Sequence, residues 1–215
     1  MSLSLWFSLL AACAVISLTP GAGAINTMTN ALAEGWRRAI WGVIGQQIAL
    51  IVHVAIVAAG VGLIVSRSPV LFNSIRYAGA AYLVYLGVRL MLVKTDAATR
   101  EEHIGVNEAA PVHARESAWS MVRRGFWVNM LNPKAIVFFL AFMPQFIKLE
   151  QPALPQYLIF ATTCVVVDVV VMWFGFAAAA RPFKRLTSTP AGRRTLNTIF
   201  GVLFIAVAAL LVFVH

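Results

Sequence analysis

Residues 16–25 read Ile-Ser-Leu-Thr-Pro-Gly-Ala-Gly-Ala-Ile, in the middle of a stretch without a charged residue that extends from 1 to 33. As one continuous helix, about 30 residues would be about 45 Å long, whereas the hydrocarbon core of a bilayer is about 30 Å thick. Pro20 removes a helical hydrogen bond, and Gly21 and Gly23 allow unusual backbone angles. The stretch therefore predicts a membrane-spanning helix that is broken into two short arms.

The 215-residue chain as a whole is strongly apolar. Residues of the set AVILMFWYC make up 60% of it and charged residues only 12%, against about 45–50% and about 25% in soluble domains. We therefore predict an all-α membrane protein without a sizeable soluble domain. The net charge of +9 does not point to a nucleic-acid partner, because cytoplasmic loops of membrane proteins collect Lys and Arg.

Six apolar segments follow one another along the chain, and each is long enough for one membrane span of roughly 20 residues. They lie at about 4–33, 39–64, 70–93, 119–146, 154–179 and 193–214. The breaks at 34–38, 94–124 and 181–194 contain twelve Lys and Arg, whereas the breaks at 65–69 and 147–153 contain two. The positive-inside rule places the first set of breaks in the cytoplasm, and with six spans both termini face the periplasm.

The proline motif occurs twice. Asn132-Pro133-Lys134 in the fourth segment parallels Thr19-Pro20-Gly21 in the first, and two further apolar segments follow each motif. Because three spans per half is an odd number, the halves must have opposite orientations, which is the inverted-repeat plan of many secondary transporters. We predict three-helix repeats at 1–93 and 119–215, with broken first and fourth helices and a cytoplasmic linker at 94–118.

Polar groups around the two breaks form the predicted substrate site. Free amides at the start of the second arm of a broken helix suit a carboxylate. A lysine at mid-depth costs about 2.5–3.5 kcal/mol on insertion scales and normally has a partner or a cavity. The alternatives are a simple proline kink, a lysine that reaches the membrane interface, and asparagines that tie two helices together. The predicted substrate-binding residues are Thr19, Pro20, Gly21, Gly23, Asn129, Asn132, Pro133 and Lys134.

Asp168 is the only acidic residue inside any of the six segments. Burial disfavours the charged form of a carboxyl group, and a carboxyl that can be neutral or charged is suited to carrying protons. The rival interpretation is a structural ion pair with Lys134. His53, near the centre of the second segment, is a second candidate for proton coupling, and a satisfied core histidine is its alternative. Gln46 and Gln47 face either the cavity or a helix contact.

The chain carries no H-E-x-x-H, G-x-S-x-G, P-loop or paired-cysteine metal motif, so we expect no enzyme, no cofactor and no metal site. A cation exporter would need several carboxylate or other hard ligands, and one intramembrane acid is too few. A membrane scaffold without transport would not need broken helices or a charged pair at mid-depth. Cys13 and Cys164 lie in apolar runs without partner spacing and are predicted to be small buried hydrophobes.

Five stretches together resemble the LysE/RhtB family of amino-acid exporters. They are LTPGAGAINTM at 18–28, AGAAYL at 78–83, NMLNPKAIVFF at 129–139, PQFI at 144–147 and VVDVVVM at 166–172. The resemblance implies a multi-pass protein of the bacterial inner membrane that exports an amino acid from the cytoplasm, driven by the proton gradient. It adds Asn26 to the predicted substrate-binding residues.

The form Gly-Ala-Ile-Asn at 23–26 most resembles the subgroup that exports homoserine and homoserine lactone, since most other relatives carry a second proline after Thr-Pro-Gly. The implied substrate is a small neutral amino acid such as homoserine, its lactone or threonine, with leucine or lysine as alternatives. The implied partners are the substrate, protons and the lipid bilayer. Gly42, Gly45, Gly60 and Gly62 allow close helix contacts, which are compatible with a homo-oligomer.

Overall fold

The computed structural model describes residues 1–67, 69–93, 115–148 and 150–213, and this part of the chain is helical without strands. The predicted linker at 94–118 lies largely outside the described residues. In chain order the elements are α1 (Leu3–Leu18), α2 (Ala22–Glu34), α3 (Trp36–Arg67), α4 (Pro69–Leu92), α5 (Ala118–Met130), α6 (Pro133–Phe142), the 3-10 turn η2 (Met143–Phe146), α7 (Ala153–Val169), the π-helical stretch η3 (Val170–Ala177), α8 (Ala180–Thr187) and α9 (Pro190–Phe213).

Four of the described helical stretches are long and apolar enough to cross a membrane: α3, α4, α7 with its continuation η3, and α9. The pairs α1 with α2 and α5 with α6 pass the same test as bent spans, which gives up to six spans. Each pair is bent by 57° at its break. The predicted all-helical membrane protein with broken first and fourth helices is thereby confirmed.

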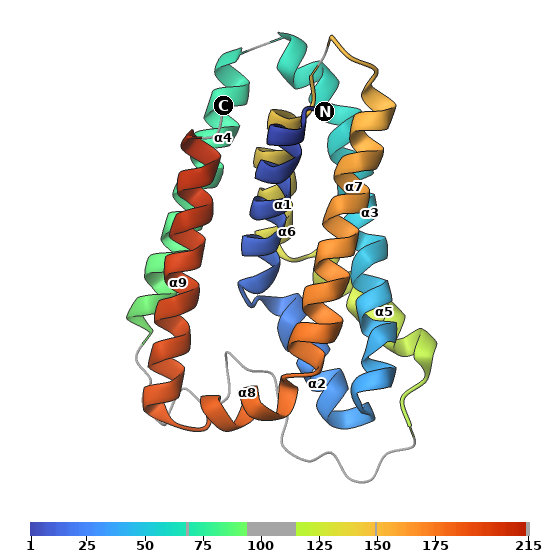
Figure 1. The fold of residues 1–215 in the computed structure, drawn as a ribbon, viewed down its shortest axis with the longest axis vertical. Helices are drawn as coiled ribbons and strands as arrows, with labels where there is room; N and C mark the ends of the chain where they lie inside the picture. The colour runs from blue at the N-terminus through green and yellow to red at the C-terminus, as the bar shows by residue number, and fades with distance from the viewer. Residues whose placement is uncertain (68, 94–114, 149, 214–215) are drawn as a thin grey trace.

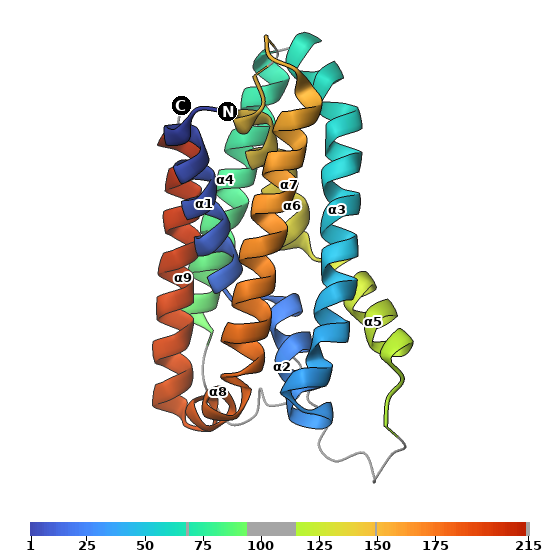
Figure 2. The ribbon, with the colours of Figure 1, turned by 45° about the vertical axis from the view of Figure 1, so that its right-hand side comes forward.

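Both termini lie at one end of the bundle, and α8 and the junction of α2 with α3 lie at the other (Figure 1). Helices α1, α2, α4 and α7 run away from the terminal end, whereas α3, α5, α6 and α9 run toward it (Figure 1; Figure 2). Corresponding helices of the two predicted repeats thus run in opposite directions, as an inverted repeat requires. The repeat boundaries and the pseudo-symmetry itself remain predictions.

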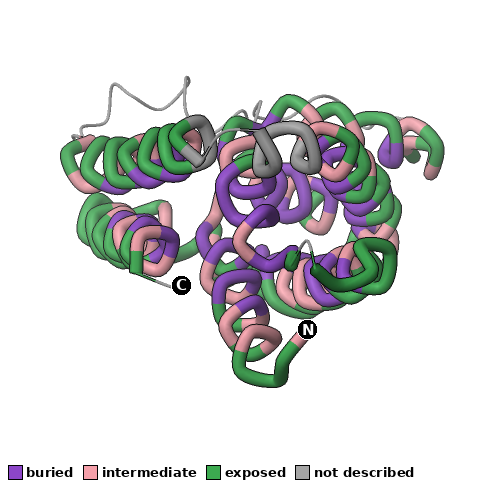
Figure 3. Tube along the Cα trace, turned by 90° about the horizontal axis from the view of Figure 1, so that it is seen from above, coloured by how far each residue is buried: buried purple, intermediate pink, exposed green. Residues whose placement is uncertain are grey.

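Buried residues gather in the middle of the bundle (Figure 3). Phenylalanines of α6 and α7 fill this centre, where Phe138 stacks on Phe142 at 4.9 Å between ring centroids and Phe139 meets Phe160 at 6.3 Å. Lipid tails are as apolar as these side chains, so the helices gain stability here from close packing rather than from leaving water.

Helices α4 and α9 pack against each other at the edge of the bundle (Figure 1; Figure 3). Arg76 of α4 is only 2% exposed and donates to the carbonyl oxygen of Leu211, at 2.9 Å, and to that of Val212. The last carbonyl groups of a helix have no partner within the helix, and a cation there also interacts favourably with the helix dipole. Arg76 therefore stabilises the end of α9.

Glycines bring α3 and α5 into backbone contact. A Cβ atom at Gly45 would collide with the carbonyl oxygen of Val122, and one at Gly125 would collide with that of Gly42. Gly42 and Gly45 therefore allow close packing of α3 against neighbouring helices of the same chain. Gly60, by contrast, has no described atom beyond its own helix within 4 Å of the Cβ position.

Helix α8 lies across the end of the bundle, in a segment that the polar sequence predicts to be a break between spans. Arg181, Lys184 and Arg185 are exposed, whereas the ring of Phe183 lies 6.4 Å from those of Phe176 and Phe200. A short helix with one apolar face and basic residues on the other is typical of the membrane interface. Hydropathy alone misses it, because the basic residues outweigh the apolar face.

Candidate substrate site

Each break contains a proline, but at a different place: Pro20 lies between α1 and α2, whereas Pro133 is the first residue of α6. Helix α1 ends at Leu18, and the backbone of Thr19 is already extended. In the second break, Asn132 is the N-cap of α6, where its side chain accepts a hydrogen bond from the backbone N–H of Lys134 at 3.1 Å. Pro133 occupies the first position of α6, where the missing N–H costs no hydrogen bond.

Lys134 connects the two breaks. Its Nζ donates to the carbonyl oxygens of Ile16, at 3.0 Å, and of Thr19, at 2.6 Å, which are carbonyl groups at the end of α1. Such groups lack partners within the helix and carry partial negative charge, so they stabilise a buried ammonium group. Lys134 is 8% exposed. Its ammonium group is buried against the end of α1, so residues of the two broken helices are in contact.

Asp168 lies on α7, two residues before the π-helical stretch η3 begins. Its Oδ1 accepts from the hydroxyl of Ser17 at 2.9 Å, and its Oδ2 accepts from Nε2 of Gln47 at 2.7 Å. Both carboxyl oxygens are thus held, one from α1 and one from α3. In the described part of the chain no ion pair joins Asp168 to Lys134, so the direct ion pair considered from the sequence is not formed in this conformation.

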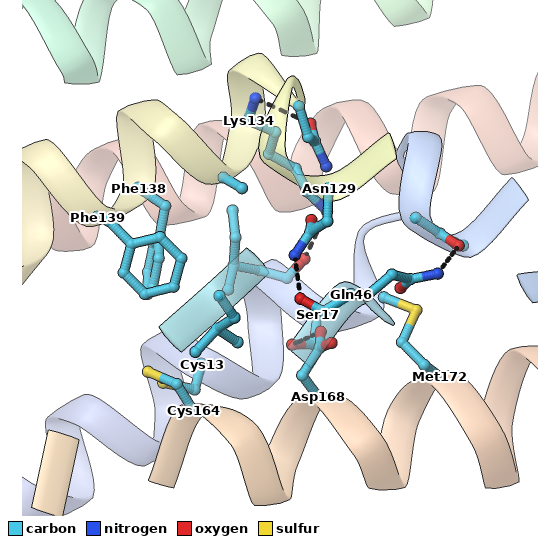
Figure 4. Close-up of a pocket in the computed structure, with 16 residues that line it drawn as sticks. Cys13, Ser17, Gln46, Asn129, Lys134, Phe138, Phe139, Cys164, Asp168 and Met172 are labelled. Carbon is cyan, nitrogen blue, oxygen red and sulfur yellow. Dashed lines mark hydrogen bonds between the residues drawn. The ribbon is translucent and has the colours of Figure 1, made fainter. Parts of the chain in front are cut away.

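Lys134 and Asp168 both line one small cavity. It has a volume of about 50 Å³, and Figure 4 shows it between residues of α1, α3, α6 and α7. A water molecule needs roughly 10–15 Å³ of such volume, so the cavity has room for a few waters and not for an amino acid. It is lined by Cys13, Ile16, Ser17, Gly23, Ala24, Gln46, Leu50, Asn129, Asn132, Lys134, Ala135, Phe138, Phe139, Cys164, Asp168 and Met172.

Gln46 of α3 forms hydrogen bonds with α2 and α5 at the wall of the cavity. Its Nε2 donates to the carbonyl oxygen of Gly23 at 3.1 Å and to Oγ1 of Thr27 at 3.0 Å. The backbone carbonyl of Gln46 accepts from Nδ2 of Asn129 at 2.9 Å. A Cβ atom at Gly23 would lie 3.0 Å from Oε1 of Gln46, so the glycine allows α2 to approach α3 closely.

The cavity brings together five of the residues predicted for the site, which are Gly23, Asn129, Asn132, Lys134 and Asp168. It is not lined by Thr19, Pro20, Gly21, Asn26, Pro133 or His53.

The residues outside the cavity lining have other surroundings. The hydroxyl of Thr19 donates to Val15 O at 2.8 Å, and Oδ1 of Asn26 accepts from Nε of Arg124 at 3.2 Å. His53 is buried and stacks on Phe139 with 5.6 Å between ring centroids, and neither of its ring nitrogens has a hydrogen-bond partner among the described residues.

Comparison with known proteins identifies the family. A family model described as LysE type translocator matches residues 14–214. The chain belongs to the LysE family. The family resemblance drawn from the sequence motifs is thereby confirmed, and this LysE-family chain is a multi-pass protein of the bacterial inner membrane.

Three relatives show how this LysE-family chain compares with others. It is 38% identical to a homoserine/homoserine lactone efflux protein of Salmonella typhimurium, over 98% of this chain and 97% of the relative. It is 33% identical to an uncharacterized membrane protein of Vibrio cholerae, over 98% of both chains. It is 28% identical to a leucine efflux protein of Enterobacter sp., over 93% of this chain and 91% of the relative. No solved structure matches the chain.

Ser17 is not among the site residues predicted from the sequence of this LysE-family chain. Gln47 is predicted to face either the cavity or a helix contact. The structure shows that both hold Asp168. One feature of the sequence could have indicated them. A single carboxyl group in hydrocarbon needs hydrogen-bond donors, and polar side chains inside the apolar spans can provide them. Which of the polar side chains would do so depends on the helix neighbours, which one sequence does not specify.

Proposed function

We propose that this chain exports a small neutral amino acid from the cytoplasm in exchange for protons, with homoserine or homoserine lactone as the first candidate and threonine as the next. One observation carries the proposal. A cavity at the meeting point of the two broken helices contains both Lys134 and Asp168, and each charged group is held by residues of the other half of the chain. The 38% identity to a homoserine/homoserine lactone efflux protein supports the choice of substrate.

The chemistry of the cavity suits both charged ends of an amino acid. Gly21, the N-cap of α2, provides no side-chain cap, and a Cβ atom there would lie 3.4 Å from Cε of Lys134. The uncapped amides of α2 and the nearby ammonium group can therefore bind the substrate carboxylate together. Asp168 can bind the substrate ammonium group, and the amides of Asn129 and Asn132 are suited to a side-chain hydroxyl.

Binding of an amino acid requires a wider cavity than the one observed. The space of about 50 Å³ has room for a few waters, so the described conformation corresponds to a closed state in the proposed cycle. In secondary transporters with inverted repeats, one repeat moves against the other around a fixed site and opens it to each side in turn. The hydrogen bonds of Lys134 with α1, and of Asp168 with α1 and α3, join the parts that would separate.

Asp168 is the proposed proton carrier. When it is charged, Ser17 and Gln47 compensate for the loss of water around its two oxygens. A proton that binds Asp168 from the periplasmic side would release these donors and the substrate ammonium group, because a neutral carboxyl group binds them more weakly. His53 lies six residues beyond Gln47 on α3 and is the proposed second titrating group.

Transport into and out of vesicles tests the proposal. Purified protein in liposomes loaded with labelled homoserine should release it at least tenfold faster than protein-free liposomes when the outside is made acidic. A protonophore should remove this stimulation, and leucine, the substrate named for the relative at 28% identity, serves as the competing candidate. Release of homoserine that does not respond to the pH gradient would contradict proton coupling, and the absence of release of homoserine, its lactone and threonine would contradict the substrate assignment.

A further inference from the structure

Cys13 and Cys164 form a pair in the interior of the protein. Their Sγ atoms lie 3.1 Å apart, and the residues are 1% and 3% exposed (Figure 4). Both are free thiols. The prediction that they are buried is therefore confirmed. The sequence spacing gives no sign of their contact, because α1 and α7 bring together two residues that are 151 positions apart in sequence.

The thiol pair lies next to the proposed proton site. Residues four apart share one face of a helix, so Cys13 lies one turn from Ser17 on α1, and Cys164 lies one turn from Asp168 on α7. The contacts Cys13–Cys164 and Ser17–Asp168 are therefore successive contacts between the same two helices. All four residues line the cavity.

We propose that Cys13 and Cys164 are a redox modification site that a small two-electron oxidant, hydrogen peroxide, closes to a disulfide. One sulfur attacks the peroxide, the O–O bond breaks, and a sulfenic acid and water are formed. The second sulfur then attacks the sulfenic sulfur, forms the S–S bond and releases a second water. Both thiol protons leave in these waters, so two thiols and one hydrogen peroxide yield one disulfide and two waters.

The structure supplies the close approach of the two sulfur atoms and room for a small oxidant beside them. A disulfide bond is about 2.05 Å long, so the two sulfur atoms need to approach each other by only about 1 Å. Buried cysteines are usually inert because apolar surroundings disfavour the reactive thiolate and keep reagents away. Here both thiols line a cavity with room for a few waters, and hydrogen peroxide is little larger than water.

The disulfide would arrest transport. Helix α1 belongs to the first predicted repeat and α7 to the second, and the bond would fix their separation beside Asp168. Alternating access requires one repeat to move against the other, so the oxidised protein would remain in the closed conformation. This consequence rests on the proposed function, whereas formation of the disulfide does not.

Intact mass tests the modification itself. The full sequence contains two cysteines, so an intramolecular disulfide has one possible pairing. After treatment of the protein in liposomes with hydrogen peroxide, unfolding and addition of N-ethylmaleimide, we expect a monomer that is lighter by two hydrogens and carries no maleimide. Dithiothreitol should restore both maleimide adducts. Both adducts after oxidation, or a disulfide-linked dimer in their place, would overturn the proposal.

The matched control moves one thiol around α1. The double variant Cys13→Ala with Ala14→Cys keeps two cysteines and turns the thiol by about 100° around the helix. It should retain both maleimide adducts under the same oxidation. Closure of the disulfide in this variant at the wild-type rate would show that the pairing does not depend on the described geometry.

Homoserine release tests the arrest separately. Release by the wild-type protein should fall at least tenfold on oxidation and recover with dithiothreitol, whereas release by Cys13→Ser or Cys164→Ser, whatever its initial rate, should not fall. Undiminished release from a protein shown by mass to be fully disulfide-bonded would overturn the arrest. If the reduced protein releases no amino acid, the proposed function fails, and the mass measurement still decides whether the dithiol site exists.

Discussion

The ammonium group of Lys134 lies 2.6 Å from the carbonyl oxygen of Thr19. This hydrogen bond joins the N-terminal turn of α6 to the end of α1. A side chain from the second proline break thus pairs with a carbonyl group at the first break. A lysine at this depth is tolerated because the break frees carbonyl groups that no helical N–H can reach. The same interaction holds the two halves of the chain together at the cavity.

Replacement of Lys134 by methionine should impair both stability and export. The side chain keeps its length, but the carbonyl oxygens of Ile16 and Thr19 lose their donor, at a cost of about 1–3 kcal/mol for a buried group left without a partner. We expect a lower unfolding temperature in detergent and at least a tenfold loss of homoserine release. Wild-type release from well-inserted Lys134→Met protein would contradict the role of Lys134 in the site.

Asp168→Asn should separate transport from the proton gradient. Asparagine has nearly the same shape and keeps one oxygen for Ser17 or Gln47, but it does not titrate. We expect loss of release driven by an imposed pH gradient, with exchange of labelled for unlabelled homoserine partly retained. Asp168→Glu is the control that keeps the titratable group.

Two other results for Asp168→Asn would contradict the coupling role or replace it with a structural one. A well-expressed Asp168→Asn protein whose release still follows the imposed pH gradient would exclude the coupling role. Poor insertion of Asp168→Asn in the membrane would instead indicate that the carboxylate mainly holds α1 and α3 in place through Ser17 and Gln47.

Gly45→Ala should strongly destabilise the fold. The new methyl group would collide with the backbone carbonyl of Val122, which cannot move without shifting α5, and forced packing of this kind costs about 1–3 kcal/mol or more. Gly60→Ala on the same helix is the matched control, because it meets no described atom within 4 Å and alanine favours the helix by about 1 kcal/mol. Thermal unfolding in detergent should show a lower midpoint for Gly45→Ala only; equal midpoints would contradict the close contact of α3 with α5.

Single cysteines should report the orientation of the bundle. In a background with Cys13 and Cys164 replaced by alanine, Arg115→Cys and Lys148→Cys place thiols at two exposed positions, one just before α5 and one between η2 and α7. The start of α5 and the start of α7 lie toward opposite ends of the bundle (Figure 1). The uneven distribution of Lys and Arg predicts that an impermeant maleimide labels position 148 in intact cells and position 115 only after the membrane is opened. Labelling of position 115 in intact cells would reverse the orientation.

The helical membrane fold follows from the sequence, because its causes are local or compositional. An apolar run of about 20 residues must become a helix in lipid, where each backbone polar group needs an internal partner. Pro20 and Pro133 have no N–H with which to continue the preceding helix wherever the rest of the chain lies, so both breaks occur at the predicted positions. Helix α8 is the exception, since Phe183 finds its apolar neighbours only in the folded chain.

By itself, the sequence determined the apolar spans, the two breaks and the presence of one lysine and one acid at membrane depth. Only the tertiary structure decided that Lys134 bonds to α1, that Ser17 and Gln47 hold Asp168, and that two cysteines 151 positions apart are in contact. The physical reason is that composition and proline act through the nearest residues of the chain. Hydrogen bonds between helices depend instead on which faces are turned toward each other, and helix packing sets that arrangement over the whole bundle.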